Sequence, residues 1–176
     1  MEACVQNRPQ PAAVKPCGVS QEQSGISEED SDTAYQKKND SAHAPTGQVM
    51  YELRVDTSFS AAHCLKGYHG DCARLHGHTW GVSATFGAER LDSVGMGMDF
   101  KILSGELDSI VRRFDHENLN DLEEFREMNP TAEHLARLIF GRLSEKLSRT
   151  PVRVLSVTVA ESDRYRVTYR GQDNEP

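Results

Sequence analysis

After residue 50 the hydrophobic residues change their spacing twice, and the order of these changes restricts the fold more than any other feature of the sequence. Strict alternation of apolar and polar residues predicts a half-buried strand, because successive side chains of a strand point to opposite faces. Alternation occurs in two segments before a helical region and in two after it: 51–59, 78–86, 155–159 and 165–169. In the third segment, we expect Leu155, Val157 and Val159 to share the apolar face.

Two helices are predicted between these pairs of strands. Apolar residues recur at helical spacing over 100–114, with Asp99 placed to cap the start, and again over 135–147. The second helix is expected to begin at Asn129-Pro130-Thr131, because proline is favoured in a first helical turn. The order ββααββ predicts an α+β fold, an antiparallel four-stranded sheet with two helices on one face. Such a domain has a small core, and oligomerisation would help to stabilise it.

The first 48 residues have a different composition from the rest. Residues 1–48 contain no Leu, Phe or Trp and a single aromatic residue, Tyr35. A segment of this kind cannot bury enough apolar surface to offset its ordering entropy, so we predict a disordered N-terminal tail. Residues 49–172 are then the folded domain. A second possibility is that translation starts at Met50, where the patterned sequence begins.

Charge and cysteine content exclude several classes of protein. The net charge of -7 argues against a sequence-independent nucleic-acid binder, which needs a basic face. No apolar run approaches the roughly 20 residues of a membrane helix, and the first residues do not have the pattern of a secretory signal. The four cysteines do not form a disulfide-framework pattern, which favours a reducing cytoplasm.

Three histidines and a cysteine gather where the first predicted strand ends and the second begins. His76 and His78 have the parity of the apolar face of the second strand, and His63 continues that of the first. All three imidazoles should therefore point to the same covered face if no bulge intervenes. Three nitrogen ligands with one position open are typical of catalytic zinc, with iron or nickel as alternatives. Cys72 could be a fourth ligand that closes a structural site, or a reactive thiol beside the cation.

Two further features place polar groups in apolar settings. Asp115 and His116 follow the first helical segment, and a carboxylate next to an imidazole can fix its tautomer and raise its basicity. A solvated helix end would explain this pair equally well. Glu161 ends the apolar face of the third strand. A carboxylate there either lies at the open edge of the sheet or accepts hydrogen bonds from a buried planar pair of donors, as in an arginine or a pterin ring.

Taken together, these residues resemble the 6-pyruvoyl-tetrahydropterin synthase superfamily, and within it the 6-carboxy-tetrahydropterin synthases of the queuosine pathway. The resemblance extends from Tyr51 to Tyr169. It depends on six motifs: Phe59-Ser60-Ala61-Ala62-His63, Cys72-Ala73-Arg74-Leu75-His76-Gly77-His78, Met98-Asp99-Phe100, Asp115-His116-Glu117-Asn118-Leu119-Asn120, Asn129-Pro130-Thr131-Ala132-Glu133 and Glu161-Ser162.

The resemblance implies the tunnelling fold, in which ββααββ subunits form a trimeric barrel and two trimers stack as a hexamer. It implies that His63, His76 and His78 bind Zn2+, and that Cys72 is the catalytic thiol and not a ligand.

The resemblance also assigns the remaining polar residues. Asp115 and His116 would complete a proton relay, reaching Cys72 from the adjacent subunit, and Glu161 would anchor the pterin ring.

The implied reaction converts 7,8-dihydroneopterin triphosphate to 6-carboxy-5,6,7,8-tetrahydropterin, acetaldehyde and triphosphate. This is a carbon–carbon lyase reaction in a tRNA modification pathway, acting on a small molecule and not on nucleic acid or membrane. The three residues between Cys72 and His76 resemble the carboxy-type enzymes, since pyruvoyl-type enzymes have a longer spacing there. A pyruvoyl-type or dihydroneopterin-aldolase-like enzyme is one alternative. The other is a non-catalytic zinc-binding relative in which Cys72 is a ligand.

Overall fold

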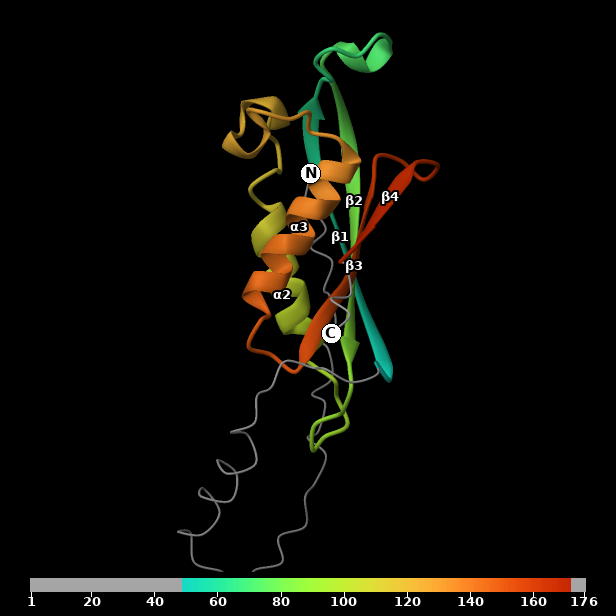
Figure 1. Ribbon diagram of the computed structural model, residues 1–176, viewed down its shortest axis with the longest axis vertical. Coiled ribbons are helices and arrows are strands. Elements are labelled where there is room, and N and C mark those ends of the chain that lie inside the picture. The colour runs from blue at the N-terminus through green and yellow to red at the C-terminus, as the bar shows by residue number, and fades with distance from the viewer. Residues whose placement is uncertain (1–48, 172–176) are drawn as a thin grey trace, which may run out of the picture. The chain divides into compact units, whose positions relative to one another are not determined.

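The computed structural model describes residues 49–171, in which two helices cover one antiparallel sheet (Figure 1). The strands lie side by side in chain order: β1 (Tyr51–His63), β2 (His76–Ala88), β3 (Val152–Ala160) and β4 (Arg166–Arg170). The helices are α2 (Phe100–Val111) and α3 (Ala132–Lys146), and three single 3-10 turns are η1 (Asp71–Ala73), η2 (Leu119–Asp121) and η3 (Glu123–Phe125). The predicted ββααββ order is confirmed, whereas the predicted tail at 1–48 lies outside the described residues.

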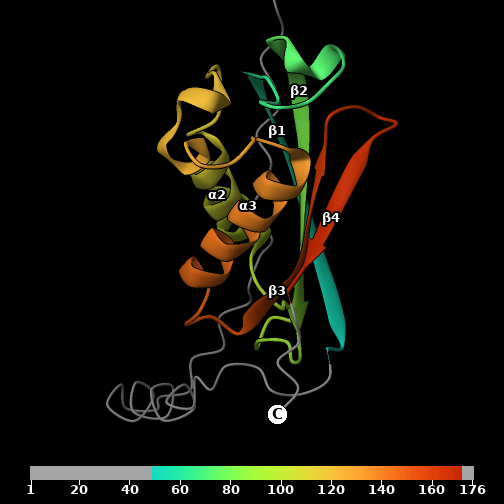
Figure 2. The ribbon, with the colours of Figure 1, turned by 45° about the horizontal axis from the view of Figure 1, so that its top comes forward.

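Both helices lie on the same face of the sheet, and side-chain caps fix where each begins (Figures 1 and 2). The Asp99 carboxylate accepts a hydrogen bond from the Lys101 N–H at 2.8 Å, and the Thr131 hydroxyl accepts one from the His134 N–H at 3.3 Å. Phe100 is the first residue of α2 and is 54% exposed, so it does not belong to the buried stripe. Among the described residues, no helix has the length and apolar character needed to cross a membrane.

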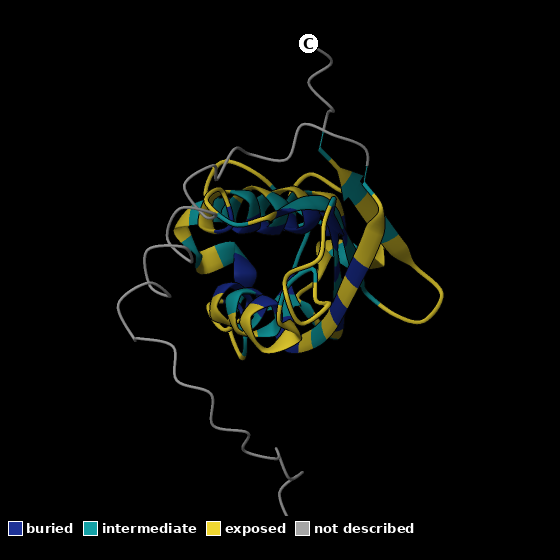
Figure 3. Ribbon diagram, turned by 90° about the horizontal axis from the view of Figure 1, so that it is seen from below, coloured by how far each residue is buried: buried dark blue, intermediate teal, exposed yellow. Residues whose placement is uncertain are grey.

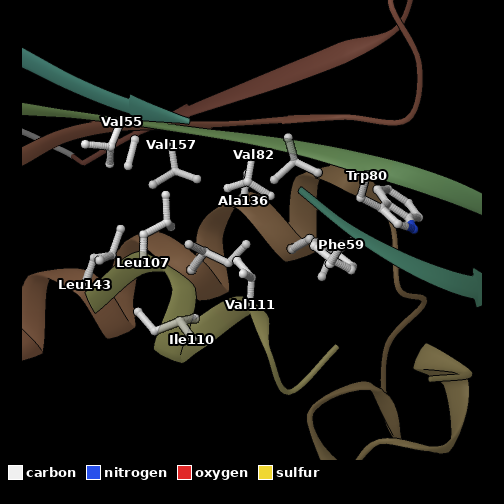
Figure 4. Packing of buried hydrophobic residues seen from close by; sticks show 14 of the residues in the cluster. Val55, Phe59, Trp80, Val82, Leu107, Ile110, Val111, Ala136, Leu143 and Val157 are labelled. Atoms are coloured by element: carbon white, nitrogen blue, oxygen red, sulfur yellow. The ribbon is translucent and has the colours of Figure 1, made fainter. Parts of the chain in front are cut away.

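The core fills the space between the sheet and the helices. Side chains of the sheet and of the helices point toward one another there (Figure 4), and buried residues line the facing surfaces (Figure 3). Trp80 and Phe86 of β2 are fully buried, as are Leu107 of α2 and Leu143 of α3. Burial of each such side chain contributes about 1.5–3 kcal/mol, so the apolar periodicity is what holds the two layers together.

Two details of β3 and β4 differ from the predicted pattern. The pairing of β2 with β3 shifts between Thr85 and Phe86, so that Val154, and not Leu155, pairs with Phe86. A β-bulge of this kind places an extra residue in one strand and reverses the faces beyond it. Leu155 is accordingly only partly buried, and the predicted face shared with Val157 is wrong for this residue. Tyr165 is 62% exposed and precedes β4.

Candidate metal centre and catalytic site

The pairing of β1 with β2 brings the three predicted histidines together. His63 is directly opposite His76, and Ala61 is opposite His78, so the imidazoles emerge on one face within two residue pairs. One ligand atom from each ring lies within 4.8 Å of the others. The parity prediction is therefore confirmed in its geometry, because β1 and β2 pair without a bulge at this end.

Backbone carbonyls fix the tautomers of two of these rings. His63 Nδ1 lies 2.7 Å from the Pro130 carbonyl oxygen, and His76 Nδ1 lies 2.8 Å from that of Arg74. A carbonyl can only accept, so each Nδ1 carries the proton and each neutral ring presents an Nε2 lone pair. The two Nε2 atoms face each other at 3.1 Å. Facing lone pairs repel unless a cation lies between them.

The third ring supplies an unsatisfied buried atom. His78 Nε2 is buried and has no hydrogen-bond partner in the described part of the chain. Burial lowers the pKa of His63 and of His78, because desolvation disfavours the imidazolium, although nearby Glu161 opposes the effect in both. Neutral imidazole is the form that binds metal ions. The three ring nitrogens, one of them otherwise without a partner, fit a zinc ion. Zinc–nitrogen bonds of about 2.0–2.1 Å at tetrahedral angles separate the nitrogens by roughly 3.3 Å.

The buried wall behind the three rings is Trp80. Its ring meets those of His63 and His78 edge-on, with centroids 4.9 and 5.1 Å apart. The Trp80 Nε1–H donates to the Ala61 carbonyl at 3.3 Å, which satisfies the indole in its buried position. The wall is rigid and apolar, so metal ligation at this end of the sheet would be shielded from water on one side.

Cys72 lies apart from this group. It belongs to η1, in the loop between β1 and β2, and its carbonyl accepts a hydrogen bond from the Leu65 N–H at 2.8 Å. The candidate metal-binding group that the described residues form contains His63, His76 and His78, and no cysteine. The geometry therefore gives no support to Cys72 as a fourth ligand.

Asp115 and His116 form a pair attached to the free edge of β1. Asp115 Oδ2 lies 3.0 Å from His116 Nδ1, while Asp115 Oδ1 accepts from the Ser60 N–H at 2.9 Å. The Ser60 N–H holds the pKa of Asp115 below its usual value, with His116 adding to the effect against some desolvation. The His116 N–H donates back to the Ser60 carbonyl at 2.6 Å. His116 has φ +62°, a left-handed conformation that is stabilised by its own hydrogen bond to Ser60 and by that of the neighbouring Asp115.

His116 and His78 line the same cavity of about 550 Å³ at the metal end of the sheet. Ser60 and Thr79 also line it, and Cys72 does not. Within one subunit, His116 therefore shares a cavity with His78 but not with the predicted thiol.

Glu161 follows β3 directly and lies near the histidines, as its effect on the pKa values of His63 and His78 indicates. Its backbone N–H donates to the Tyr165 carbonyl at 3.0 Å, which closes the turn into β4. As predicted, Glu161 continues the apolar face of β3 by one residue. Its carboxylate therefore lies at the end of the sheet that holds the three histidines.

Sequence reasoning missed the residues that hold the β1–β2 loop in place. Asn120 accepts from the Cys64 N–H at 2.8 Å and donates to the Cys64 carbonyl at 2.9 Å. Asn129 does the same to Lys66, at 2.8 and 3.0 Å. Both asparagines lie in motifs that the sequence singled out, but their partners are backbone groups, which leave no signature of residue type.

Comparison with known proteins gives one consistent family. A sequence model described as 6-pyruvoyl tetrahydropterin synthase matches residues 52–172. The chain is 38% identical over 101 residues to the 6-carboxy-5,6,7,8-tetrahydropterin synthase of Synechocystis sp., covering 54% of this chain and 77% of that protein. It is 36% identical over 90 residues to the dihydroneopterin monophosphate aldolase of Pyrococcus furiosus, covering 51% and 72%.

A solved structure agrees with this result. The 6-pyruvoyl tetrahydropterin synthase of Caenorhabditis elegans superposes with a TM-score of 0.60 at 26% identity, covering 72% of this chain and 100% of that one. The four-stranded sheet with two helices on one face is thus the tunnelling fold. Because the family match covers more than half of the chain, together with the strands that carry the three histidines, the chain belongs to the 6-pyruvoyl tetrahydropterin synthase family.

Proposed function

We propose that this chain is a zinc-dependent 6-carboxy-5,6,7,8-tetrahydropterin synthase. The substrates would be 7,8-dihydroneopterin triphosphate and one water, which supplies the second carboxylate oxygen, and the products 6-carboxy-5,6,7,8-tetrahydropterin, acetaldehyde and triphosphate. The observation that carries the proposal is the group of three histidines without a fourth protein ligand among the described residues, since an open position is what a catalytic metal needs. The name of the 38% identical Synechocystis protein supports the choice of reaction.

The metal would be held by His63, His76 and His78, and when bound it would polarise the side-chain hydroxyls of the substrate as a Lewis acid. Glu161 would accept hydrogen bonds from the amino and ring N–H groups of the pterin, because a carboxylate matches such a donor pair in a bidentate manner. A ring bound there would direct the substrate side chain toward the three histidines, since Glu161 lies beside them.

The proton transfers are assigned to Asp115, His116 and Cys72. Because Asp115 engages His116 Nδ1, the imidazole would take up and release protons at Nε2. Cys72 would act as the second acid–base group, at the opposite side of the substrate. Since Cys72 does not line the cavity that His116 lines, we infer that the two groups meet between neighbouring subunits of an oligomer, with a hexamer of two stacked trimers as the expected state.

The aldolase is the second candidate, because a relative with that name is 36% identical to this chain. A retro-aldol cleavage would break a carbon–carbon bond of the same side chain and would use the same acid–base groups. Its two-carbon product would be a hydroxyaldehyde whose hydroxyl still carries the triphosphate, whereas the proposed reaction releases acetaldehyde and free triphosphate. A pyruvoyl-type reaction, as in the name of the Caenorhabditis elegans protein, would release no two-carbon fragment.

A product assay distinguishes these reactions. Purified enzyme, with its metal content measured by elemental analysis, is incubated with 7,8-dihydroneopterin triphosphate, and the aldehydes are trapped as hydrazones. Acetaldehyde together with a carboxypterin supports the proposal. A hydroxyaldehyde that still carries the triphosphate would identify an aldolase, and a pyruvoyl pterin without aldehyde would identify the third reaction. Acetaldehyde formation would also support a role in the cytoplasmic pathway to queuosine.

A further inference from the structure

The Asn129-Pro130-Thr131 motif connects the start of α3 with the most deeply buried histidine. The Pro130 carbonyl accepts from His63 Nδ1 at 2.7 Å, and His63 is 1% exposed. This hydrogen bond makes Nε2 the ligand atom and sets the angle of the ring. The position of one backbone carbonyl therefore controls the geometry of one metal ligand.

Asn129 fixes that carbonyl relative to the strand that carries His63. Its side chain forms two hydrogen bonds with the backbone of Lys66, three residues after His63, at 2.8 and 3.0 Å. Its own carbonyl accepts from Thr131 N–H at 2.9 Å and lies 2.7 Å from His134 Nδ1. Residue 129 is thus held through both its side chain and its backbone, and the fixed φ of Pro130 passes this restraint to the next carbonyl.

We propose that Asn129 is a positioning residue for the metal centre, which holds the Pro130 carbonyl against His63 Nδ1 and thereby orients His63 for ligation. This proposal rests on the three-histidine metal centre of the proposed function. His134 supports Asn129 from α3, through its Nδ1 to the Asn129 carbonyl. Loss of an outer partner of a metal ligand typically weakens metal binding about 10- to 100-fold.

Asn120 provides a matched control within the same loop. Its side chain forms the same pair of hydrogen bonds, to Cys64, at 2.8 and 2.9 Å. The residue after Asn129 has a carbonyl that is hydrogen-bonded to a histidine of the metal centre, whereas the residue after Asn120 does not. General loosening of the loop should therefore appear in both variants, whereas misplacement of the Pro130 carbonyl should appear only in the variant at position 129.

The experiment compares Asn129→Leu with Asn120→Leu in the full chain, without substrate. Zinc affinity is measured by competition with a chromophoric chelator, and ligand geometry by the visible absorption of the Co2+-substituted protein. We expect Asn129→Leu to bind zinc about 10- to 100-fold more weakly and to shift the Co2+ bands, and Asn120→Leu to stay within about threefold of the wild type. If Asn129→Leu does not fold, His134→Leu, which removes only the donor to the Asn129 carbonyl, should weaken zinc binding in the same direction.

Equal affinities of Asn129→Leu and the wild type would overturn the proposal, as would equal losses in the Asn129 and Asn120 variants. Absence of stoichiometric zinc binding by the wild type would instead overturn the metal centre itself. The two failures are therefore distinguishable, because the first leaves the wild-type metal site and its activity intact.

Discussion

His63 and His76 face each other across the β1–β2 pair with their Nε2 atoms 3.1 Å apart, while a carbonyl oxygen holds the proton of each ring on the far nitrogen. The buried Nε2 of His78, which has no hydrogen-bond partner among the described residues, belongs to the same group. These three nitrogens could hold a cation. A cation bound there should stabilise the fold.

Zinc should raise the melting temperature of the protein. At free zinc one hundredfold above its dissociation constant, binding to the folded state alone stabilises it by about 2.7 kcal/mol. His76→Ala should abolish this increase, whereas His69→Ala, in the exposed part of the loop, should retain it. Differential scanning calorimetry with and without a chelator measures both, and a zinc-dependent shift that survives in His76→Ala would contradict the ligand assignment.

Cys72→Ala should retain zinc and lose turnover. The candidate metal group contains no cysteine, so metal content should stay at the wild-type level. The rate should fall at least about 100-fold, the usual effect of removing an acid–base group. Cys64→Ala is the control, since the structure uses Cys64 through its backbone atoms. Loss of zinc in the Cys72 variant would show that the thiol is a ligand.

Mixing two inactive variants should restore activity if the catalytic site lies between subunits. Cys72→Ala and His116→Ala each lack one group, and the cavity that His116 lines does not reach Cys72 in a single subunit. Co-refolded oligomers should recover about a quarter of the wild-type activity, because random association of symmetric subunits joins two intact groups in one of four pairings. Inactive mixed oligomers of normal size would mean that each subunit works alone.

Glu161→Gln should weaken substrate binding without changing metal content. Replacing the carboxylate by an amide removes a charged hydrogen bond worth about 1.5–3 kcal/mol, so KM should rise roughly 10- to 100-fold. Asp163→Asn, two residues further along the same exposed turn, is the control and should have a normal KM. Steady-state kinetics with elemental analysis tests this, and an unchanged KM for the Gln variant would argue against a pterin anchor.

Glu124 should make the folded protein sensitive to acid. Burial raises the pKa of Glu124, but hydrogen bonds and charge from Arg142 and Arg113, both 2.6 Å from Oε1, outweigh it and leave the pKa below the ordinary 4.5. A lowered carboxyl pKa stabilises the fold above the unfolded-state pKa, and this stability is lost as pH falls through the folded value.

The comparison of wild type with Glu124→Gln tests this in urea unfolding at several pH values. At neutral pH, the free energy of unfolding should differ by about 1–3 kcal/mol. The difference should shrink once the pH falls below about 4.5. A difference that does not depend on pH would contradict the assigned ion pairs.

Prediction from the sequence succeeded where the spacing of side chains determines the geometry of the site. It failed where backbone pairing determines that geometry. Parity on two regular strands was enough to bring His63, His76 and His78 to one face, because β1 and β2 pair in register. The same reasoning failed for Leu155, since a bulge in the pairing is set by the neighbouring strand and not by the local pattern.

For a related reason, the hydrogen-bond partners of the site residues could not be predicted from the sequence. The carbonyl that orients His63 belongs to Pro130, but any residue has the same group. The left-handed turn of His116 depends on its hydrogen bond to Ser60, 56 positions earlier, and on the bond between Ser60 and Asp115. Long-range backbone contacts of this kind need three-dimensional information.

Trp80 is the only tryptophan of the chain, and its ring touches two of the three candidate metal ligands. Indole emission responds strongly to the charge and polarity of adjacent groups. The protein therefore contains an indole fluorophore at its candidate metal centre, with no second tryptophan to contribute to the signal. Metal entry, metal loss and ligand disorder can each be followed optically in real time on the unlabelled protein.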